Sequence, residues 1–186
     1  MNYRDVIKEW KQISENFFDA RESIYKKATN LTIDRLKEGH KILVFGNGGS
    51  AAQAQHFVAE LVNKFLKERP PIRALSLTTD TSILTSIAND TSFDYVFSRQ
   101  IEAFGEKGDI ALGLSTSGNS PNVIEAMKAA KAKGLVTIAL TGKDGGQLRS
   151  LVDYLLDVPS EETPRIQEVH ILLLHLLAQE IEDKLG

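Results

Sequence analysis

A histidine and a glutamate four residues apart, His56 and Glu60, are the first side chains whose types and spacing suggest chemistry. In a helix, residues at positions i and i+4 lie on one face about one turn apart. Such a pair can share a metal ion or perform acid/base chemistry together, and it can equally be a hydrogen-bonded surface pair. The choice depends on which other side chains reach the same face.

A second group of this kind lies near the end of the sequence, at Gln167, His170 and His175. At about 100° per residue, Gln167 and His175 differ by roughly 80° around a helix, whereas His170 and His175 differ by roughly 140°. The two histidines therefore do not enter one site from the same helix, and periodicity does not select between them. Because the chain has no cysteine, histidine, carboxylate or amide groups would have to bind any metal.

A glycine-rich turn comes shortly before His56. It consists of Gly46-Asn47-Gly48-Gly49-Ser50 and follows the apolar run 42–45. Its glycines permit positive φ angles and close approach of backbone N–H groups to a ligand, and Ser50 is predicted to be the N-cap of the next helix. The positive end of that helix faces the same space, which predicts a site for an anion or a polyol.

The same turn leaves two alternatives open. Gly46, Gly48 and Ala51 fit the pattern G-x-G-x-x-A of dinucleotide-binding turns. The acid that such a site needs after the second strand would then be Asp80. The other alternative is a tight strand-to-helix turn that binds nothing.

A hydroxyl-rich loop forms the second candidate anion site. Its sequence is Ser115-Thr116-Ser117-Gly118-Asn119-Ser120-Pro121, in which Ser120 can cap a helix and Pro121 suits the first helical turn. Hydroxyls and free N–H groups at a helix N-terminus bind phosphate. The Gly-Lys-Ser/Thr of a triphosphate-binding loop is absent, so a sugar phosphate fits better. A capped helix start that binds nothing is the simpler alternative, but it leaves the run of three hydroxyls unexplained.

The elements that must position these residues follow from hydrophobic patterning. Strands are predicted at 42–45, 74–77, 110–114, 136–140 and 154–158. Helices are predicted between and after them, at 50–67, 81–88, 93–104, 120–133, 145–151 and 164–184. This alternation predicts an α/β fold with a parallel sheet covered on both faces. Ligands bind beyond the carboxyl ends of such strands, so the two loops flank one crevice if the first and third strands are neighbours.

Two further segments bear on assembly. Residues 3–38 are predicted to form two helices, with apolar stripes through Val6, Ile7, Trp10, Ile13 and Phe17 and through Ile24, Leu31 and Leu36. In the last helix, apolar residues point in nearly every direction, at Ile166, Val169, Leu172, Leu173, Leu174, Leu176 and Leu177. A monomer would expose part of this surface, which predicts oligomerisation. Coverage by the opening helices within one subunit is the alternative.

Composition narrows the class of protein. The 186 residues, 42% of them hydrophobic, predict one domain over 1–186, with oligomerisation helices at 1–38 and an α/β core at 39–186. A net charge of -3 argues against a broad nucleic-acid-binding surface. The apolar run 171–178 is far shorter than the roughly 20 residues of a membrane span. The charged N-terminal stretch has no signal-peptide character, so we expect a cytoplasmic protein.

Five stretches of the sequence, read in order, carry a family resemblance. They are GNGGSAAQAQHFVAEL, IANDTSFDYVFSRQ, LSTSGNSPNVIEAM, LTGKDGG and RIQEVHILLLH. Together they resemble the phosphoheptose isomerases, within the larger group of sugar-isomerase (SIS) domains, over nearly the whole chain. The resemblance implies a three-layer, flavodoxin-like SIS fold with a five-stranded parallel sheet and N-terminal helices. It also implies a homotetramer whose active sites combine residues of more than one subunit.

The activity implied by the resemblance is conversion of sedoheptulose 7-phosphate to D-glycero-D-manno-heptose 7-phosphate through an enediol. This reaction begins the synthesis of nucleotide-activated heptose for lipopolysaccharide or surface glycans. Such an exchange needs a base beside the carbonyl carbon and an acid at the carbonyl oxygen. We expect Glu60 to be the base and His175 the acid.

The resemblance also assigns binding residues. One zinc ion per subunit would be bound by His56, Glu60, Gln167 and His175. The sugar phosphate would contact Asn47, Gly48, Gly49, Ser50, Glu60, Asn89, Asp90, Ser115, Thr116, Ser117, Ser120 and Gln167. The zinc would polarise the carbonyl as a Lewis acid, or it would serve mainly to lock two helices together.

Two positions depart from the family pattern. Pro164 stands where many members have Asp, and Lys64 stands where many have Arg. Arginine can bind an anion through two N–H groups at once, whereas lysine presents a single ammonium group.

Two rival functions remain. One is a non-catalytic SIS tetramer that binds a protein partner such as a replication initiator, and the other is a sugar-phosphate sensor. The presence of Glu60 and His175 favours the enzyme.

Overall fold

The computed structural model describes residues 2–186 and contains a five-stranded parallel sheet. Its strands are β1 (Ile42–Gly46), β2 (Ala74–Ser76), β3 (Ile110–Ser115), β4 (Val136–Thr141) and β5 (Tyr154–Asp157). The strand order is β2-β1-β3-β4-β5, and Phe45 of β1 pairs with Gly113 of β3. The first and third strands are therefore neighbours, as the shared crevice requires, and the strand order reverses between them.

Six α-helices accompany the sheet. They are α1 (Tyr3–Lys37), α2 (Gly49–Val62), α3 (Thr81–Asp90), α4 (Ser98–Phe104), α5 (Pro121–Ala132) and α6 (Thr163–Leu185). Two short 3-10 helices are also present, η1 (Phe93–Tyr95) and η2 (Gly146–Ser150). The segment predicted as a helix over 145–151 is the second of these, and the segment 93–104 is divided between η1 and α4.

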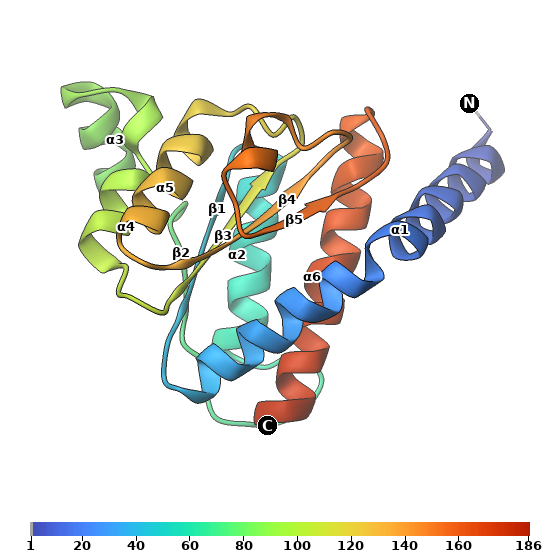
Figure 1. Ribbon diagram of the computed structural model, residues 1–186, viewed down its shortest axis with the longest axis horizontal. Coiled ribbons are helices and arrows are strands. Elements are labelled where there is room, and N and C mark those ends of the chain that lie inside the picture. The colour runs from blue at the N-terminus through green and yellow to red at the C-terminus, as the bar shows by residue number, and fades with distance from the viewer. Residues whose placement is uncertain (1) are drawn as a thin grey trace.

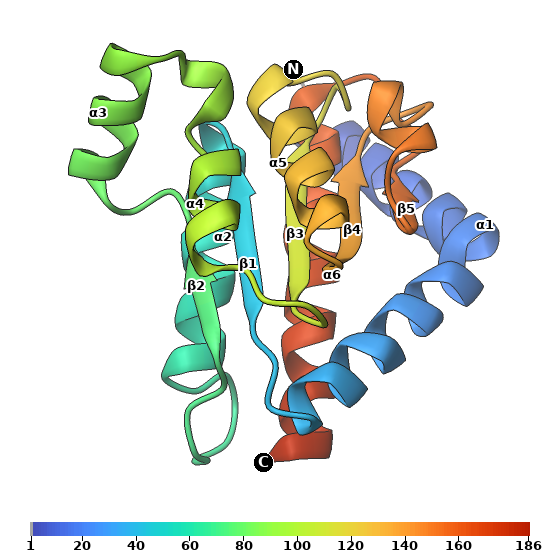
Figure 2. The same ribbon diagram turned by 60° about the vertical axis from the view of Figure 1, so that its left-hand side comes forward.

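Two helical layers sandwich the sheet (Figures 1 and 2). Alternate strand residues point to opposite faces. Ile42 and Val44 of β1 face a core that α1, α2 and α6 cover, whereas Leu43 and Phe45 face a core covered by α4 and α5. Both cores are fully enclosed, which explains why the strands lack strict polar alternation. The predicted three-layer α/β fold is confirmed.

The opening segment is one helix, so the prediction of two helices is wrong. α1 runs for 35 residues without interruption from its N-cap, Asn2, whose side chain accepts a hydrogen bond from the N–H of Arg4. No glycine or proline interrupts the segment, and its buried side is continuous through Phe17, Tyr25 and Ile33. Its N-terminal part extends beyond the body of the molecule (Figure 1).

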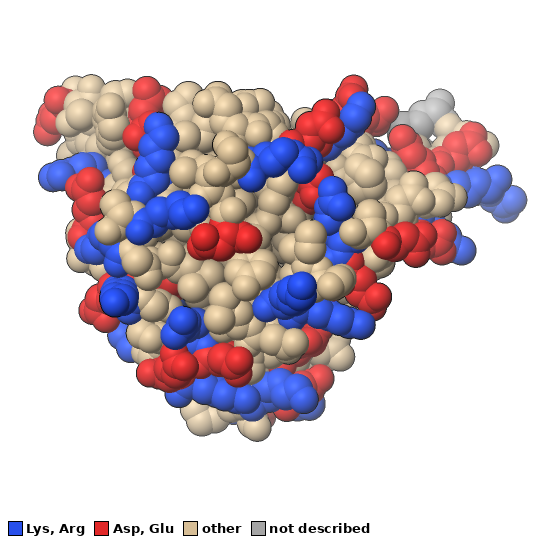
Figure 3. All heavy atoms as spheres, in the orientation of Figure 1, with Lys and Arg blue, Asp and Glu red and all other residues tan. Residues whose placement is uncertain are grey.

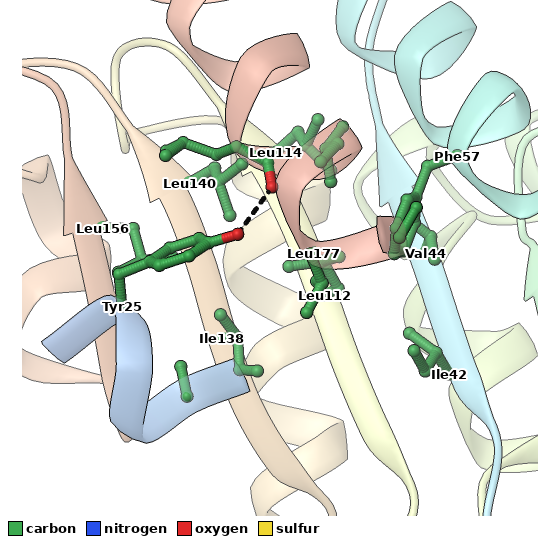
Figure 4. Close-up of a cluster of buried hydrophobic side chains, with 14 of the residues drawn as sticks. Tyr25, Ile42, Val44, Phe57, Leu112, Leu114, Ile138, Leu140, Leu156 and Leu177 are labelled. Carbon is green, nitrogen blue, oxygen red and sulfur yellow. Dashed lines mark hydrogen bonds between the residues drawn. The ribbon is translucent and has the colours of Figure 1, made fainter. Parts of the chain in front are cut away.

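α6 lies against α1 and α2, which cover much of its apolar surface. The hydroxyl of Tyr25 on α1 donates a hydrogen bond of 2.9 Å to the carbonyl of Leu173 (Figure 4). Leu173, Leu174 and Leu177 are buried in this contact region. Most of the apolar surface of α6 is therefore covered within one subunit. This is the alternative to oligomerisation that the sequence left open.

None of the helices within residues 2–186 combines the length and the apolar character that a membrane crossing requires. On the face drawn in Figure 3, acidic and basic side chains are interspersed. This distribution agrees with the small net charge of -3.

Candidate active site

The carboxyl-terminal part of α2 and the middle of α6 bring three candidate side chains together. His56 Nε2 and His175 Nε2 are 2.8 Å apart, so one imidazole donates a hydrogen bond to the other. Glu60 Oε1 lies 3.5 Å from His56 Nε2, one helical turn further along α2. The sequence spacing of four residues thus places both α2 side chains on the face that α6 contacts.

His175 has the more restricted environment of the two histidines. Its ring stacks on that of Phe65, with centroids 5.5 Å apart and an interplanar angle of 26°. Burial and the neighbouring His56 imidazole lower the pKa of His175 below its usual value, and Glu60 acts in the opposite direction. The side chain of His56 is 46% exposed and that of Glu60 is 21% exposed, so the group opens to solvent from the α2 side.

The structure selects between the two histidines of α6. His170 is fully buried and pairs through Nε2 with the carbonyl oxygen of Thr141, at 3.0 Å. Burial lowers the pKa of His170 to about 4, so the ring is neutral at pH 7. Its position in the core keeps it away from His56, and His175 is the histidine that reaches the site.

Gln167 lies nearer the amino end of α6 than His175 does. A Cβ atom on Gly49 would lie 2.8 Å from Gln167 Nε2, so the glycine makes room for this amide. The backbone carbonyl of Gln167 accepts a hydrogen bond from Gln53 Nε2, at 2.7 Å. Gln167 thus contacts the start of α2, and eight residues, or about 12 Å of helix, separate it from His175 along α6.

The donor types around His56 fit zinc, which binds imidazole nitrogen and carboxylate oxygen. Two nitrogens bound tetrahedrally at about 2.0–2.1 Å from one zinc lie roughly 3.3 Å apart. The observed separation of 2.8 Å is shorter, and no three His, Asp or Glu side chains of residues 2–186 are already arranged as a metal site. If the two rings moved apart by roughly half an ångström, their nitrogens would have the spacing that zinc requires.

The glycine turn lies at the carboxyl end of β1. The helix begins at Gly49 with Gly48 as its N-cap residue, so Ser50 lies inside the first turn and the prediction of Ser50 as N-cap is wrong. Gly48 has φ +55°, which only glycine adopts readily, and Gly48 and Gly49 are exposed. Ser50 is buried, and the backbone of the turn is therefore its accessible part.

Asn47 is tied to the neighbouring loop. Asn47 and Asn122 exchange two hydrogen bonds of 2.8 Å between their side-chain amides. Asn122 is 1% exposed and lies in the first turn of α5. Sequence reasoning missed Asn122, because an asparagine after Ser-Pro has the character of an ordinary helix start.

The hydroxyl-rich loop lies at the carboxyl end of β3, beside the glycine turn. Ser115 Oγ and Ser120 Oγ are 3.0 Å apart, and Ser120 occupies the N-cap position without a side-chain capping bond. Ser117 Oγ accepts a hydrogen bond from the N–H of Asn119, at 3.1 Å, while Thr116 is half-buried. The Ser120 hydroxyl is thus not used in capping, and Pro121 begins the helix as predicted.

The remaining predicted contacts lie around α3. Asn89 and Asp90 are exposed at its C-terminal end, where Asn89 Nδ2 donates to Asp90 Oδ1 at 2.8 Å. Asp80 is the N-cap of α3, and its carboxylate accepts a hydrogen bond of 2.9 Å from the N–H of Ile83. This capping role explains Asp80 without a dinucleotide.

Comparison with known proteins agrees with this geometry. Residues 5–142 match the family model described as the SIS domain. A phosphoheptose isomerase of Thermodesulfovibrio yellowstonii is 50% identical over 97% of this chain and 90% of its own length. The chain belongs to the phosphoheptose isomerase family. A family member from Aliarcobacter butzleri is also 50% identical, over 97% of both chains.

Solved structures of the family have the same fold. The phosphoheptose isomerase of Neisseria gonorrhoeae superposes with a TM-score of 0.91 at 44% identity, over 97% of both chains. That of Francisella tularensis gives 0.92 at 36% identity, over 98% of this chain and 100% of its own. The family resemblance in the sequence is confirmed, and a non-catalytic SIS protein is not favoured.

Proposed function

We propose that the protein isomerises sedoheptulose 7-phosphate to D-glycero-D-manno-heptose 7-phosphate. The observation that carries this proposal is that Glu60 from α2 and His175 from α6 both lie beside His56, in a chain of the phosphoheptose isomerase family. In this scheme the Glu60 carboxylate removes the proton from the carbon beside the carbonyl. His175 gives a proton to the carbonyl oxygen, which forms the enediol. The proton held by Glu60 then returns to the former carbonyl carbon, while the hydroxyl on the neighbouring carbon gives its proton to His175 and becomes the aldehyde.

The positions of the loops support binding of a phosphorylated sugar with several carbons. His56 is seven residues into α2 from Gly49, or about 10 Å along the helix. An extended seven-carbon sugar phosphate has a comparable length. Its phosphate would bind the hydroxyl-rich loop and the backbone N–H groups of the glycine turn, while its carbonyl end approaches His175. Asn89, Asp90 and Gln167 would contact the sugar hydroxyls.

One zinc ion per subunit is part of the proposal. His56, Glu60 and His175 would bind it, with Gln167 as a fourth ligand if its side chain turns toward His175. Bound zinc would supply Lewis-acid polarisation of the substrate carbonyl. The donor chemistry around His56 supports this assignment, and the fully buried position of His170 supports the choice of His175.

We also propose a cytoplasmic homotetramer that supplies heptose for lipopolysaccharide or surface glycans. The projecting part of α1 supports assembly, because Tyr3 is 74% exposed and Ile7 is 62% exposed. A groove of about 360 Å³ lies beside them, lined by Trp10 of α1 and Ile171 of α6 among others. Light scattering coupled to gel filtration should give the mass of four chains, and a monomeric mass would refute the assembly.

The direct test is an NMR assay of the purified protein with sedoheptulose 7-phosphate, before and after chelation and return of zinc. Appearance of aldoheptose signals would establish the isomerase, and loss on chelation with recovery on zinc return would establish metal dependence. Absence of conversion by folded, zinc-loaded protein would refute the proposed activity. A protein that binds the sugar phosphate without converting it would instead be a sensor.

A further inference from the structure

The loop of residues 63–73, called here the α2 exit loop, folds back from the end of α2 onto the C-terminal part of α6. Glu182 of α6, which is 1% exposed, binds the start of this loop. Its carboxylate accepts hydrogen bonds from the backbone N–H groups of Phe65, Leu66 and Lys67, at 3.0, 2.7 and 2.9 Å. Three backbone positions of the loop are therefore fixed by one side chain from α6.

Arg69 completes the attachment from the other side. Its Nε lies 3.2 Å from Glu182 Oε1, and its side chain is 0% exposed. Its guanidinium also donates to the backbone carbonyls of Glu60 and Leu61, at 2.6 and 2.8 Å. These carbonyls belong to the last turn of α2, where a helix offers no further N–H group to bond them. Arg69 therefore joins the end of α2, which includes Glu60, to Glu182 of α6.

The electrostatics of Glu182 agree with a permanently charged pair. Burial alone would raise the pKa of Glu182, but the three backbone hydrogen bonds and Arg69 outweigh it and hold that pKa below its usual value. Removing one partner of such a buried pair leaves an uncompensated charge, so the pair is costly to break and keeps the loop attached to α6. The α2 exit loop is thus a fixed part of the protein surface beside the candidate active site.

Phe65 is the residue that this attachment brings to the active site. Its ring is half-buried and stacks on His175, with 5.5 Å between centroids. The His175 imidazole also bonds through Nε2 to His56, so the edge contact and the stack together restrict rotation of the ring. Stacked aromatic rings attract one another beyond the effect of area burial, so the contact favours this orientation of the His175 ring.

We propose that Phe65 is a positioning residue for the His175 imidazole. The buried Glu182–Arg69 pair holds Phe65 in place by fixing the backbone of the α2 exit loop. This inference rests on the proposed function for its effect on turnover, whereas its effect on the orientation of His175 does not depend on that function.

The test compares Phe65→Ala with Phe65→Tyr, which retains the aromatic face, and with Leu66→Ala, a neighbouring change at a side chain that is 64% exposed. In zinc-loaded protein, Phe65→Ala should lower kcat by about 10- to 100-fold and change KM by less than about threefold, because binding is preserved while the acid is misplaced. Phe65→Tyr and Leu66→Ala should stay within about threefold of the parent protein in both constants.

A second readout observes His175 directly. The chain has four histidines, so metal-free protein labelled at histidine 13Cε1 gives four resolvable ring signals, and His175→Gln assigns the one of interest. Loss of the shielding phenyl face in Phe65→Ala should move the His175 Hε1 signal downfield, and Phe65→Tyr should restore it. Glu182→Gln should reproduce the shift.

Three results would overturn the proposal: an unchanged His175 signal in Phe65→Ala, an equal loss of kcat in Leu66→Ala, or a failure of Phe65→Tyr to restore kcat. If Glu182→Gln does not fold, Phe65→Ala still decides the question, since it removes no buried hydrogen bond. If the parent protein isomerises no heptose phosphate, the proposed function fails, and the NMR shift alone then confirms or overturns the positioning role.

Discussion

The side-chain amides of Asn47 and Asn122 donate to and accept from each other, in two hydrogen bonds of 2.8 Å. One residue belongs to the glycine turn after β1, and the other begins α5 after β3. The two candidate anion-binding loops are therefore fixed relative to one another by side chains as well as by the pairing of their strands. Asn47 uses half of its hydrogen-bonding capacity in this contact, which leaves one N–H and one lone pair for a ligand.

Asn122→Ala should weaken substrate binding and lower stability. It leaves the half-buried Asn47 amide without its partner, at a cost of about 1–3 kcal/mol in the free energy of unfolding. We expect KM for the sugar phosphate to rise several-fold, because the two loops lose their fixed spacing. Urea unfolding and initial rates test both effects. The matched control is Asn16→Ala, which breaks an exposed amide pair with Gln12 on α1, and an equal loss there would contradict the role of Asn122.

Glu60→Gln and His175→Gln should each abolish measurable turnover without unfolding the protein. Loss of a general acid or base typically lowers the rate by about 10²–10⁴-fold. Glu60 is 21% exposed and His175 is half-buried, so neither change disrupts the core. Conversion followed by NMR, with circular dichroism for the fold, is the measurement. Glu102→Gln, at an exposed side chain of α4, is the control, and full activity in either site variant would remove that residue from the mechanism.

Gly118→Ala should be severely destabilising. Gly118 has φ +65°, and an added Cβ would lie 2.1 Å from the carbonyl oxygen of Gly145. Strain of about 1–3 kcal/mol from the positive φ would add to a clash that only backbone movement relieves. Gly39→Ala is the matched control, because Gly39 has φ +90° with no atom within 4 Å of the new Cβ. Thermal unfolding should show a clearly larger loss for Gly118→Ala, and equal losses would show that the packing against Gly145 does not matter.

His170 should make the protein less stable in mild acid. Its pKa falls from 6.5 to about 4 on folding, so both states are neutral above pH 6.5 and stability is fully present there. As the pH falls from 6.5 to 4, the unfolded state binds a proton that the folded state does not, and the free energy of unfolding decreases. Between pH 7.5 and 4.5 this single group should cost roughly 2.5 kcal/mol.

Urea unfolding of the parent protein and of His170→Leu at several pH values isolates this effect. The lost hydrogen bond to Thr141 lowers the stability of the variant by an amount that does not vary with pH. The difference between the two proteins should therefore shrink or reverse as the pH falls. A constant difference from pH 7.5 to 4.5 would show that folding does not lower the pKa of His170.

The sequence predicted the sheet and both loops because each rests on a local pattern. Apolar runs that end near Gly46 and Ser115 identify strands with candidate ligand-binding ends, and the four-residue spacing of His56 and Glu60 identifies one helix face. The choice of His175 over His170 needed either the family resemblance or the fold. Whether a histidine on an apolar helix faces the core or a neighbouring helix is set by packing, which periodicity alone does not specify.

The features that were missed depend on contacts between distant segments. Glu182 reads as an ordinary charge near the end of a helix, yet it binds a loop more than 110 residues earlier in the chain. The continuity of α1 was also missed, because two apolar stripes in different registers suggested two helices. A single long helix satisfies both stripes because it contacts both α6 and β5.

The separation of His56 and His175 by 119 residues has a consequence for how the protein is made. At about 5–20 residues per second, a ribosome adds that length of chain in roughly 6–24 s. During this interval both candidate anion-binding loops are synthesised, but the histidine of α6 is not. Because α6 also supplies Leu173, Leu174 and Leu177 to the core, one face of the sheet stays uncovered and His56 lacks its partner until the end of the chain has been made.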